Sequence, residues 1–271
     1  MLLIKSKPVR TLCGALETLN LLTLRLWWKN PGRVKPFAGK VFRDYMSLVE
    51  CDKWVCRELH EIFPEWSDNR IVLEHMRGAG IVTPVDELAY LALITKNLRP
   101  MRIFEIGTFR GRTALNFALN APPECIVYTL DLPMDVRESY GQQTNASDAA
   151  IIAGSETGID YRGKDVASKI RQLYGDSASM DFSSYYAKMD LVFVDGAHHY
   201  AAVVSDTQNA LKMVADGGVI LWHDFANYGD YNDVTRAVVE LLPRGEVIQI
   251  GATQLALYRK PPHTPLSQIE S

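Results

Sequence analysis

The sequence predicts an α/β domain with a mostly parallel β-sheet. From about residue 83 onward, short apolar runs bounded by turn residues alternate with segments of helical periodicity. Such a run is typical of a strand buried on both faces, and strands that alternate with helices pair in parallel. The runs are residues 102–106, 126–130, 191–194 and 219–222.

Helices are expected before, between and after these strands. The first is expected to begin at Thr83, which can cap it, with Pro84 at the first helical position. Asp86 lies in its first turn, where the helix dipole favours an acid. Gly217 and Gly218 are expected to end a later helix. The other expected helices span residues 113–119, 201–215 and 233–242.

Three parts are expected along the chain. Residues 1–80 carry apolar residues at helical spacing, chiefly over 12–26 and 37–63, and are expected to form a helical appendage. Residues 81–260 are expected to form the α/β domain, and residues 261–271 a polar tail.

Two further segments of the α/β domain have their own signatures. The pattern at 246–250 and 254–258, on either side of Gly251, predicts a terminal hairpin. Between Asp131 and Ile170 no strand is apparent, and the stretch is rich in Gly, Ser, Asn and Asp. Loops this long are usually functional or disordered, so a lid over the active site and plain disorder both stay open.

Composition and charge exclude several classes of protein. The chain has 271 residues, of which 47% are hydrophobic and 23% charged, as in ordinary globular proteins. A formal net charge of −3 offers no positive field for a phosphate backbone, so no nucleic acid partner is expected. Four cysteines without a CxxC pair indicate a reducing compartment.

The N-terminal stretch predicts a cytoplasmic protein without a transmembrane segment. Lys5, Lys7 and Arg10 interrupt its apolar run, which argues against a signal peptide and a spanning helix. The helical pattern over 12–26 ends in an apolar tryptophan pair. That end suits a membrane surface, a second subunit as in a homodimer, or packing on its own domain, and the alternatives stay open.

A glycine-containing turn follows the first strand. The stretch from Glu105 to Gly111 lies where open α/β sheets bind ligands beyond their strand ends, and Gly107 allows a close approach to the backbone. Its spacing, E-x-G-x-x-x-G, differs from the G-x-G-x-x-G of nicotinamide enzymes. A bare tight turn would explain the glycines equally well.

Acids follow the next two strands. Asp131 is placed to accept hydrogen bonds from both ribose hydroxyls of a nucleoside that lies across the sheet, although it can also form a turn before Pro133. Asp176 and Ser177 follow a plausible strand at 170–174. They can meet polar atoms of adenine, or they can form a turn or a helix cap.

Acids and histidines follow the last two buried strands. Asp195 and His198 come after 191–194, and His223 and Asp224 come after 219–222. Two acids on neighbouring strand ends can hold an oxygen-loving cation, and an imidazole beside them can act as a base. A single histidine more often packs than reacts, but several on one rim favour chemistry.

Taken in order, these motifs resemble those of the class I S-adenosylmethionine-dependent methyltransferases. Within that family they are most similar to the small O-methyltransferases, including a branch that modifies sugars of natural products. The resemblance extends over about residues 83–260, and it implies a Rossmann-like sheet of seven strands with a reversed last strand. The motifs that carry it are Phe104-Glu105-Ile106-Gly107 with Gly111, Leu130-Asp131, Gly175-Asp176-Ser177, Val194-Asp195-Gly196-Ala197-His198 and Trp222-His223-Asp224.

The resemblance also implies roles for single residues. In metal-dependent relatives, acids after the fourth and fifth strands bind Mg2+, and here these are Asp195 and Asp224. The sugar-modifying branch has a D-x-x-H arrangement whose histidine is the base, which His198 matches. The position after Asp224, often a third ligand, is Phe225, and this departure leaves metal use open. The implied catalytic residues are His198, Asp195 and His223. The implied cofactor-binding residues are Glu105, Gly107, Thr108, Gly111, Thr113, Asp131, Asp176, Ser177 and Asp195.

The expected activity is therefore methyl transfer from S-adenosylmethionine to a hydroxyl group of a small molecule, with a sugar or natural-product glycoside as the leading acceptor. A metal-dependent catechol or phenol O-methyltransferase and a cofactor-binding protein without transfer activity are the alternatives. A nicotinamide-dependent oxidoreductase is disfavoured by the missing G-x-G-x-x-G.

Overall fold

The computed structural model describes residues 54–67, 70–76, 83–136, 149, 156–227, 232–243 and 245–262. By the contacts between its Cα atoms the chain divides into two compact units, Met1–Val49 and Glu50–Ser271. Everything below concerns the second unit, so the described residues 54–67 and 70–76, assigned by the sequence to the appendage, group with the sheet. The expected N-terminal helix over 12–26 and the polar tail from residue 263 lie outside the described residues. Among the described residues, no helix is both long and apolar enough to cross a membrane.

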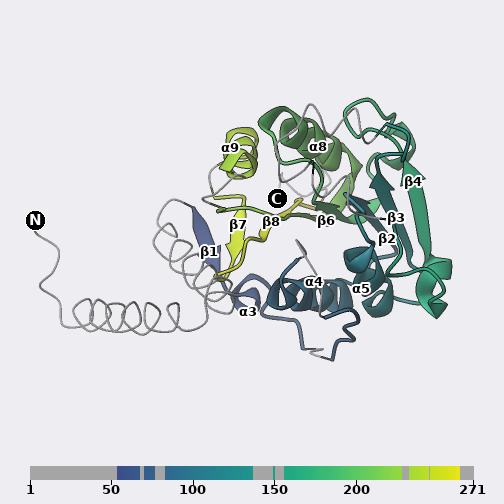
Figure 1. The fold of residues 1–271 in the computed structure, drawn as a ribbon. Coiled ribbons are helices and arrows are strands. Elements are labelled where there is room, and N and C mark those ends of the chain that lie inside the picture. Colours follow the sequence, from purple (N-terminus) through teal and green to yellow (C-terminus); the bar gives the residue numbers. More distant parts are fainter. Residues whose placement is uncertain are drawn as a thin grey trace, which may run out of the picture. The chain divides into compact units, whose positions relative to one another are not determined.

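A single eight-stranded sheet forms the centre of this unit (Figure 1). All neighbouring strands pair in parallel except β8, which is antiparallel to both of its neighbours. The predicted α/β class, the mostly parallel sheet and the reversed last strand are thus confirmed. The strands, in their order across the sheet, are β1 (Val55–Arg57), β7 (Ile248–Ile250), β8 (Ala256–Arg259), β6 (Val214–Trp222), β5 (Met189–Val194), β2 (Arg102–Ile106), β3 (Ile126–Asp131) and β4 (Ile170–Tyr174).

The sheet has eight strands, one more than the seven that the sequence predicts, and the additional strand is β1. The helical spacing over 37–63 predicted that Val55 lies on a helix, but Val55–Arg57 forms β1 and pairs in parallel with β7. Trp54 fixes this edge because its indole Nε1 donates to Gln249 Oε1 over 2.6 Å. The apolar residues here satisfy a helical period and a short strand alike, and only the distant partner strand decides between them.

Helices cover both faces of the sheet and create two cores. In Figure 1, α8 (Tyr200–Met213) and α9 (Asn232–Leu241) lie on one side, and α4 (Val85–Leu98) and α5 (Arg112–Asn120) lie on the other. Side chains alternate along each strand, so Val192 packs into the α8 and α9 core whereas Leu191 packs into the α4 and α5 core. Because both faces are buried, the strands read as continuous apolar runs.

Two helix boundaries differ from the sequence expectation. Helix α4 begins at Val85 with Pro84 as its N-cap, and the Thr83 carbonyl instead accepts a hydrogen bond from Arg112. Helix α8 ends at Met213, and the two glycines that were expected to stop it lie inside β6. At Gly218 a Cβ would come within 3.0 Å of the Asp190 carbonyl oxygen, so this glycine serves the close approach of β6 to β5.

The long segment between β3 and β4 is described only at its two ends and at residue 149. Its last part packs back on the turn after β2, because Gly158 N donates to the Phe109 carbonyl over 3.0 Å and Asp160 N to the Arg110 carbonyl over 2.9 Å. It then forms a short 3-10 helix, η1 (Asp165–Lys169), that leads into β4. The described residues 156–169 therefore pack against the turn after β2. A lid stays a prediction for the residues of this segment that are not described.

Candidate active site

The sequence-predicted residues gather at one edge of the sheet. Register pairing places Ile106 beside both Leu130 and Val194, and Val194 beside Trp222, so β2, β3, β5 and β6 end level with one another. Parallel strands present their carboxyl ends at the same edge, which is where open α/β sheets bind ligands. The residues that follow these strands are therefore close in space although they are up to 117 positions apart in the sequence, from Gly107 to Asp224.

The turn after β2 depends on Gly107. Its φ of +102° lies in a region that side chains rarely adopt, and a Cβ there would meet the Asp195 carbonyl oxygen at 1.9 Å. Asp195 N in turn donates to the Ile106 carbonyl over 2.9 Å. Gly107 thus allows the loop after β2 to contact the backbone of the loop after β5, and this contact fixes the position of the Asp195 backbone.

Gly111 has a different neighbour. It is the N-cap of α5 with φ +81°, and a Cβ there would come within 2.5 Å of the Tyr161 ring. The Tyr161 hydroxyl donates to Gln172 Oε1 over 2.7 Å, so the ring is held between α5 and β4. Thr113, also expected at the cofactor, lies buried in the first turn of α5.

Glu105 is a fully buried carboxyl with an unused oxygen. Its Oε2 accepts a hydrogen bond from the Thr129 hydroxyl, which also lies 2.6 Å from Thr108 Oγ1. Its Oε1 has no hydrogen-bond partner among the described residues. Burial raises the pKa of Glu105 well above its ordinary value, and Asp195 adds to the effect. An unpaired buried acceptor is costly, so this oxygen marks a place for a donor from a ligand.

Asp131 closes the same turn from β3. Its Oδ2 accepts from Phe109 N over 3.0 Å, and its Oδ1 accepts from Leu132 N over 2.8 Å. Thr157 Oγ1, from the packed end of the long segment, lies 3.5 Å from the same Oδ2. The carboxylate is thus oriented by backbone amides at the edge where the sequence places the ribose.

Asp176 and Ser177 begin the turn that follows β4. Asp176 Oδ1 accepts from Ala178 N over 3.0 Å, which is the turn-forming role that the sequence left open. The Gly175 amide donates to the Asp131 carbonyl over 3.0 Å and ties this turn to the ribose edge. Whether the two side chains also meet adenine stays a prediction.

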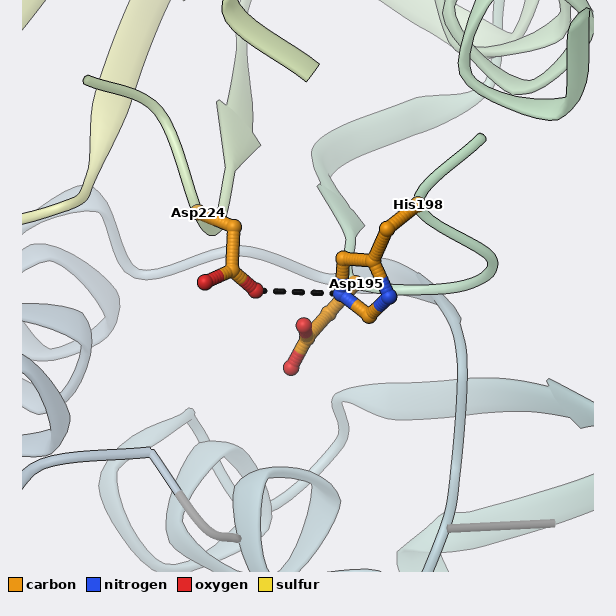
Figure 2. A group of neighbouring side chains, drawn as sticks. All are labelled: Asp195, His198 and Asp224. Carbon is orange, nitrogen blue, oxygen red and sulfur yellow. Dashed lines mark ion pairs between the residues drawn. The ribbon is translucent and has the colours of Figure 1, made fainter. Parts of the chain in front are cut away.

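Asp195, His198 and Asp224 form a compact cluster (Figure 2). One ligand atom from each lies within 4.8 Å of the others, and His198 Nε2 is 3.0 Å from Asp224 Oδ2. Asp195 and His198 come from the loop after β5, and Asp224 from the loop after β6. Two carboxylates and an imidazole can bind a divalent cation. Without a cation, the carboxylates can orient the imidazole and stabilise its charge when it accepts a proton.

His223 joins this cluster through a partner that the sequence analysis missed. Its Nε2 lies 2.8 Å from Glu87 Oε2, and its Nδ1 lies 2.9 Å from Asp224 Oδ2 and 3.4 Å from Asp195 Oδ1. Glu87 is buried in the first turn of α4, and its Oε1 accepts from Gln254 N over 2.8 Å. The one signal in the sequence was an acid next to Asp86, and the helix dipole explains such an acid without any site.

The charges of the cluster are set by burial and by each other. Burial raises the pKa of Asp195 to about 6, although His223 opposes this. Burial disfavours the charged form of His223, but Asp195, Asp224 and Glu87 outweigh it and raise its pKa well above the ordinary value. Burial alone would raise the pKa of Asp224, but the imidazoles of His223 and His198 have the larger effect and lower it. At neutral pH the cluster therefore contains an ionised Asp224 beside a protonated His223.

The backbone after β6 is strained where it presents Asp224. Asp224 has φ +56° and Ala226 has φ +57°, values that are uncommon for residues other than glycine. Asn227 Nδ2 donates to Asp224 Oδ1 over 3.0 Å. Phe225, which replaces the ligand expected after Asp224, is fully buried and packs edge-on against Trp54 at 5.1 Å. The sequence read Phe225 as a missing ligand, and the structure uses it to anchor the strained loop.

Comparison with known proteins identifies a related family. Residues 104–225, which run from β2 to the loop after β6, match the family model of a methyltransferase domain. No curated protein matches the sequence.

Solved structures with similar folds include three O-methyltransferases. The enzyme TomG from Streptomyces achromogenes, in complex with SAM, is 17% identical, with 80% of this chain and 96% of that chain covered and a TM-score of 0.43. An enzyme from Bacillus cereus in complex with SAH is 17% identical, with 68% and 84% covered and a TM-score of 0.42. NovP is 18% identical, with 66% and 81% covered and a TM-score of 0.49.

Proposed function

We propose, from the methyltransferase domain that this chain carries over residues 104–225, that it transfers the methyl group of S-adenosylmethionine to a hydroxyl group of a small molecule. The observation that carries the proposal is the single strand edge at which a glycine turn, a ribose-positioned acid and a carboxylate–imidazole cluster meet. These parts suit a nucleoside cofactor on one side and a hydroxyl that must lose a proton on the other.

The residues present fit such a cofactor. The unpaired Glu105 Oε1 offers an acceptor, and the backbone at Gly107 leaves no room for a side chain. Asp131 would hold the ribose hydroxyls, and Asp176 with Ser177 the adenine. When bound, S-adenosylmethionine supplies an electrophilic methyl group. The protein's main contribution is alignment, because holding two reactants near attack distance is worth roughly 7 to 11 kcal/mol.

His198 is the proposed base. Its Nε2 lies 3.0 Å from Asp224 Oδ2, and the lowered pKa of Asp224 keeps that carboxylate ionised, so Asp224 orients the imidazole. The hydroxyl proton would pass to His198 as the oxygen attacks. His223, fixed by Glu87, would balance the charge of the two aspartates from the other side.

A divalent cation such as Mg2+ fits the same cluster. Asp195 and Asp224 would hold it, with His198 close enough to join them. A bound cation would polarise the acceptor oxygen and lower its pKa. The imidazole in the set also suits cations that accept nitrogen ligands. Activity that a chelator abolishes and Mg2+ restores would support this part of the proposal, and full activity in chelator would leave the two aspartates as orienting residues.

The acceptor is proposed to be a sugar hydroxyl, because the D-x-x-H pattern of Asp195 and His198 is shared with the sugar-modifying branch. A panel of glycosides, catechols and simple phenols, assayed with radiolabelled cofactor, tests this. Methylation of phenols alone would redirect the proposal to the catechol class. Cofactor binding without turnover on the whole panel would favour the binding protein.

The first experiment measures cofactor binding. S-adenosylhomocysteine and, separately, NAD are titrated into the purified protein by calorimetry. We expect micromolar binding of the former, lost in Asp131→Ala and retained in the control Asp135→Ala, an exposed acid of the same loop. No binding of S-adenosylhomocysteine would overturn the proposed function.

The base assignment makes a separate demand. His198→Ala is expected to lower kcat by about 10²- to 10⁴-fold while leaving the Kd for S-adenosylhomocysteine nearly unchanged. The control is His199→Ala, whose Nδ1 accepts from Ala202 N as the cap of α8. Equal loss of turnover and cofactor affinity in His198→Ala would contradict the assignment.

A further inference from the structure

Asp206 is a buried carboxyl for which the proposed mechanism has no use. It lies in the second turn of α8, and its side chain is 0% exposed. Neither of its carboxyl oxygens has a hydrogen-bond partner among the described residues. A buried polar group without partners costs folding free energy. Because this carboxyl lowers the stability of the fold, we look for a role that it has in ligand binding or catalysis.

The surroundings of Asp206 connect it to two loops of the strand edge. A Cβ on Gly196 would lie 3.2 Å from Asp206 Oδ2, so the carboxyl rests on the backbone of the loop that carries Asp195. The Ser177 hydroxyl, from the turn after β4, lies close enough to lower the pKa of Asp206, although its geometry falls short of a good hydrogen bond. Burial prevails and raises that pKa to about 7, and Asp176 adds to the rise.

The geometry points to Asp206 as a positioning residue for cofactor binding, one that holds Ser177 and thereby fixes the turn after β4 against the adenosine part of the cofactor. This inference rests on the proposed function, because it requires a nucleoside at this turn. Asp206 lies on α8 against the Gly196 backbone, and it acts on the ligand through Ser177. In the nucleoside-bound protein the Ser177 hydroxyl donates to Asp206, which satisfies an oxygen that is otherwise unpaired.

A double-mutant cycle tests the inference. The Kd for S-adenosylhomocysteine is measured by calorimetry for the wild type, Asp206→Ala, Ser177→Ala and the double variant. We expect each single variant to bind about tenfold more weakly, and the double variant to bind no more weakly than Asp206→Ala, since the two groups act as a unit. Asp206→Asn keeps one acceptor oxygen and is expected to recover part of the loss. In turnover, Asp206→Ala should raise KM for S-adenosylmethionine and leave KM for the acceptor unchanged.

Asp190 provides the matched control. Its Oδ2 accepts from Met101 N over 2.7 Å and from Arg102 N over 2.9 Å, at the opposite end of β5. Asp190→Ala is expected to lower the melting temperature and to leave the Kd unchanged. An unchanged Kd in Asp206→Ala, or losses that simply add with Ser177→Ala, would overturn the inference while leaving the proposed function intact. Failure of the folded wild type to bind S-adenosylhomocysteine would overturn both.

Discussion

Replacing Asp206 by asparagine is expected to stabilise the protein at neutral and alkaline pH. The pKa of this carboxyl is about 7 in the fold, because burial disfavours its charged form, against 3.8 for the free side chain. When the folded pKa of an acid exceeds its unfolded value, the unfolded chain loses the proton first. Stability is then full below about pH 4 and falls as the pH rises toward 7.

The magnitude follows from that difference. One pKa unit corresponds to about 1.4 kcal/mol, so the ionisation of Asp206 withdraws about 4 kcal/mol of unfolding free energy between acidic and mildly alkaline pH. Asparagine has nearly the same shape and no such titration. The difference in unfolding free energy between Asp206→Asn and the wild type should therefore be near zero at about pH 3 and reach a few kcal/mol by pH 8.

The assay is urea unfolding followed by tryptophan fluorescence at several pH values, with the midpoint compared at constant slope. Contributions from the rest of the chain are the same in both proteins, so they cancel in the difference. A stability difference that does not change with pH would refute the reasoning, because the carboxyl would then be as well solvated in the fold as in the unfolded chain. Destabilisation at pH 8 would show instead that Asp206 is ionised and satisfied.

Three further predictions concern packing. Gly111→Ala should cost about 2 kcal/mol or more of unfolding free energy, because of its φ of +81° and the clash with Tyr161, and thermal melts should show a smaller loss in a Tyr161→Ala background. Cys125, whose pKa burial raises to about 12, should resist iodoacetamide at pH 8 until the protein unfolds, as mass spectrometry would detect. Asn116→Ala should speed amide hydrogen exchange at Glu74, whose N–H and carbonyl both bond to the Asn116 amide.

The sheet was largely predictable because its signals are local. The apolar runs at 102–106 and 126–130 coincide with β2 and with all of β3 except its last residue, and a glycine between two short runs predicted the terminal hairpin. The strand β1 was missed because three residues carry no period of their own, and its partner β7 lies almost at the other end of the domain. Strand pairing over such a separation is decided by packing and leaves no trace in the local pattern.

The candidate site was predictable only where a residue directly follows a strand. Asp195 and Asp224 were expected together because parallel strands end at one edge, and the structure brings them together with His198. Glu87 and Asp206 lie inside helices, where an acid is usually a solvated surface residue. Helical spacing nevertheless places both on apolar faces, because Leu91 lies four residues after Glu87, and Val203 and Ala210 lie three before and four after Asp206. That spacing is the signal that could have found them. Their partners come from other elements, so only the assembled fold reveals those partners.

The strand edge is organised at the expense of the stability of the ligand-free protein. Glu105 and Asp206 keep oxygens without partners, and Asp224 sits on strained backbone. Replacing such groups by apolar residues would stabilise most folds. Within the cluster the opposing charges of His223 and its carboxylates offset part of the burial cost, whereas Glu105 Oε1 and Asp206 have no such compensation. The uncompensated atoms lie toward the glycine turn and the turn after β4. The proposed cofactor side of the edge is therefore where a bound ligand would recover the most folding free energy.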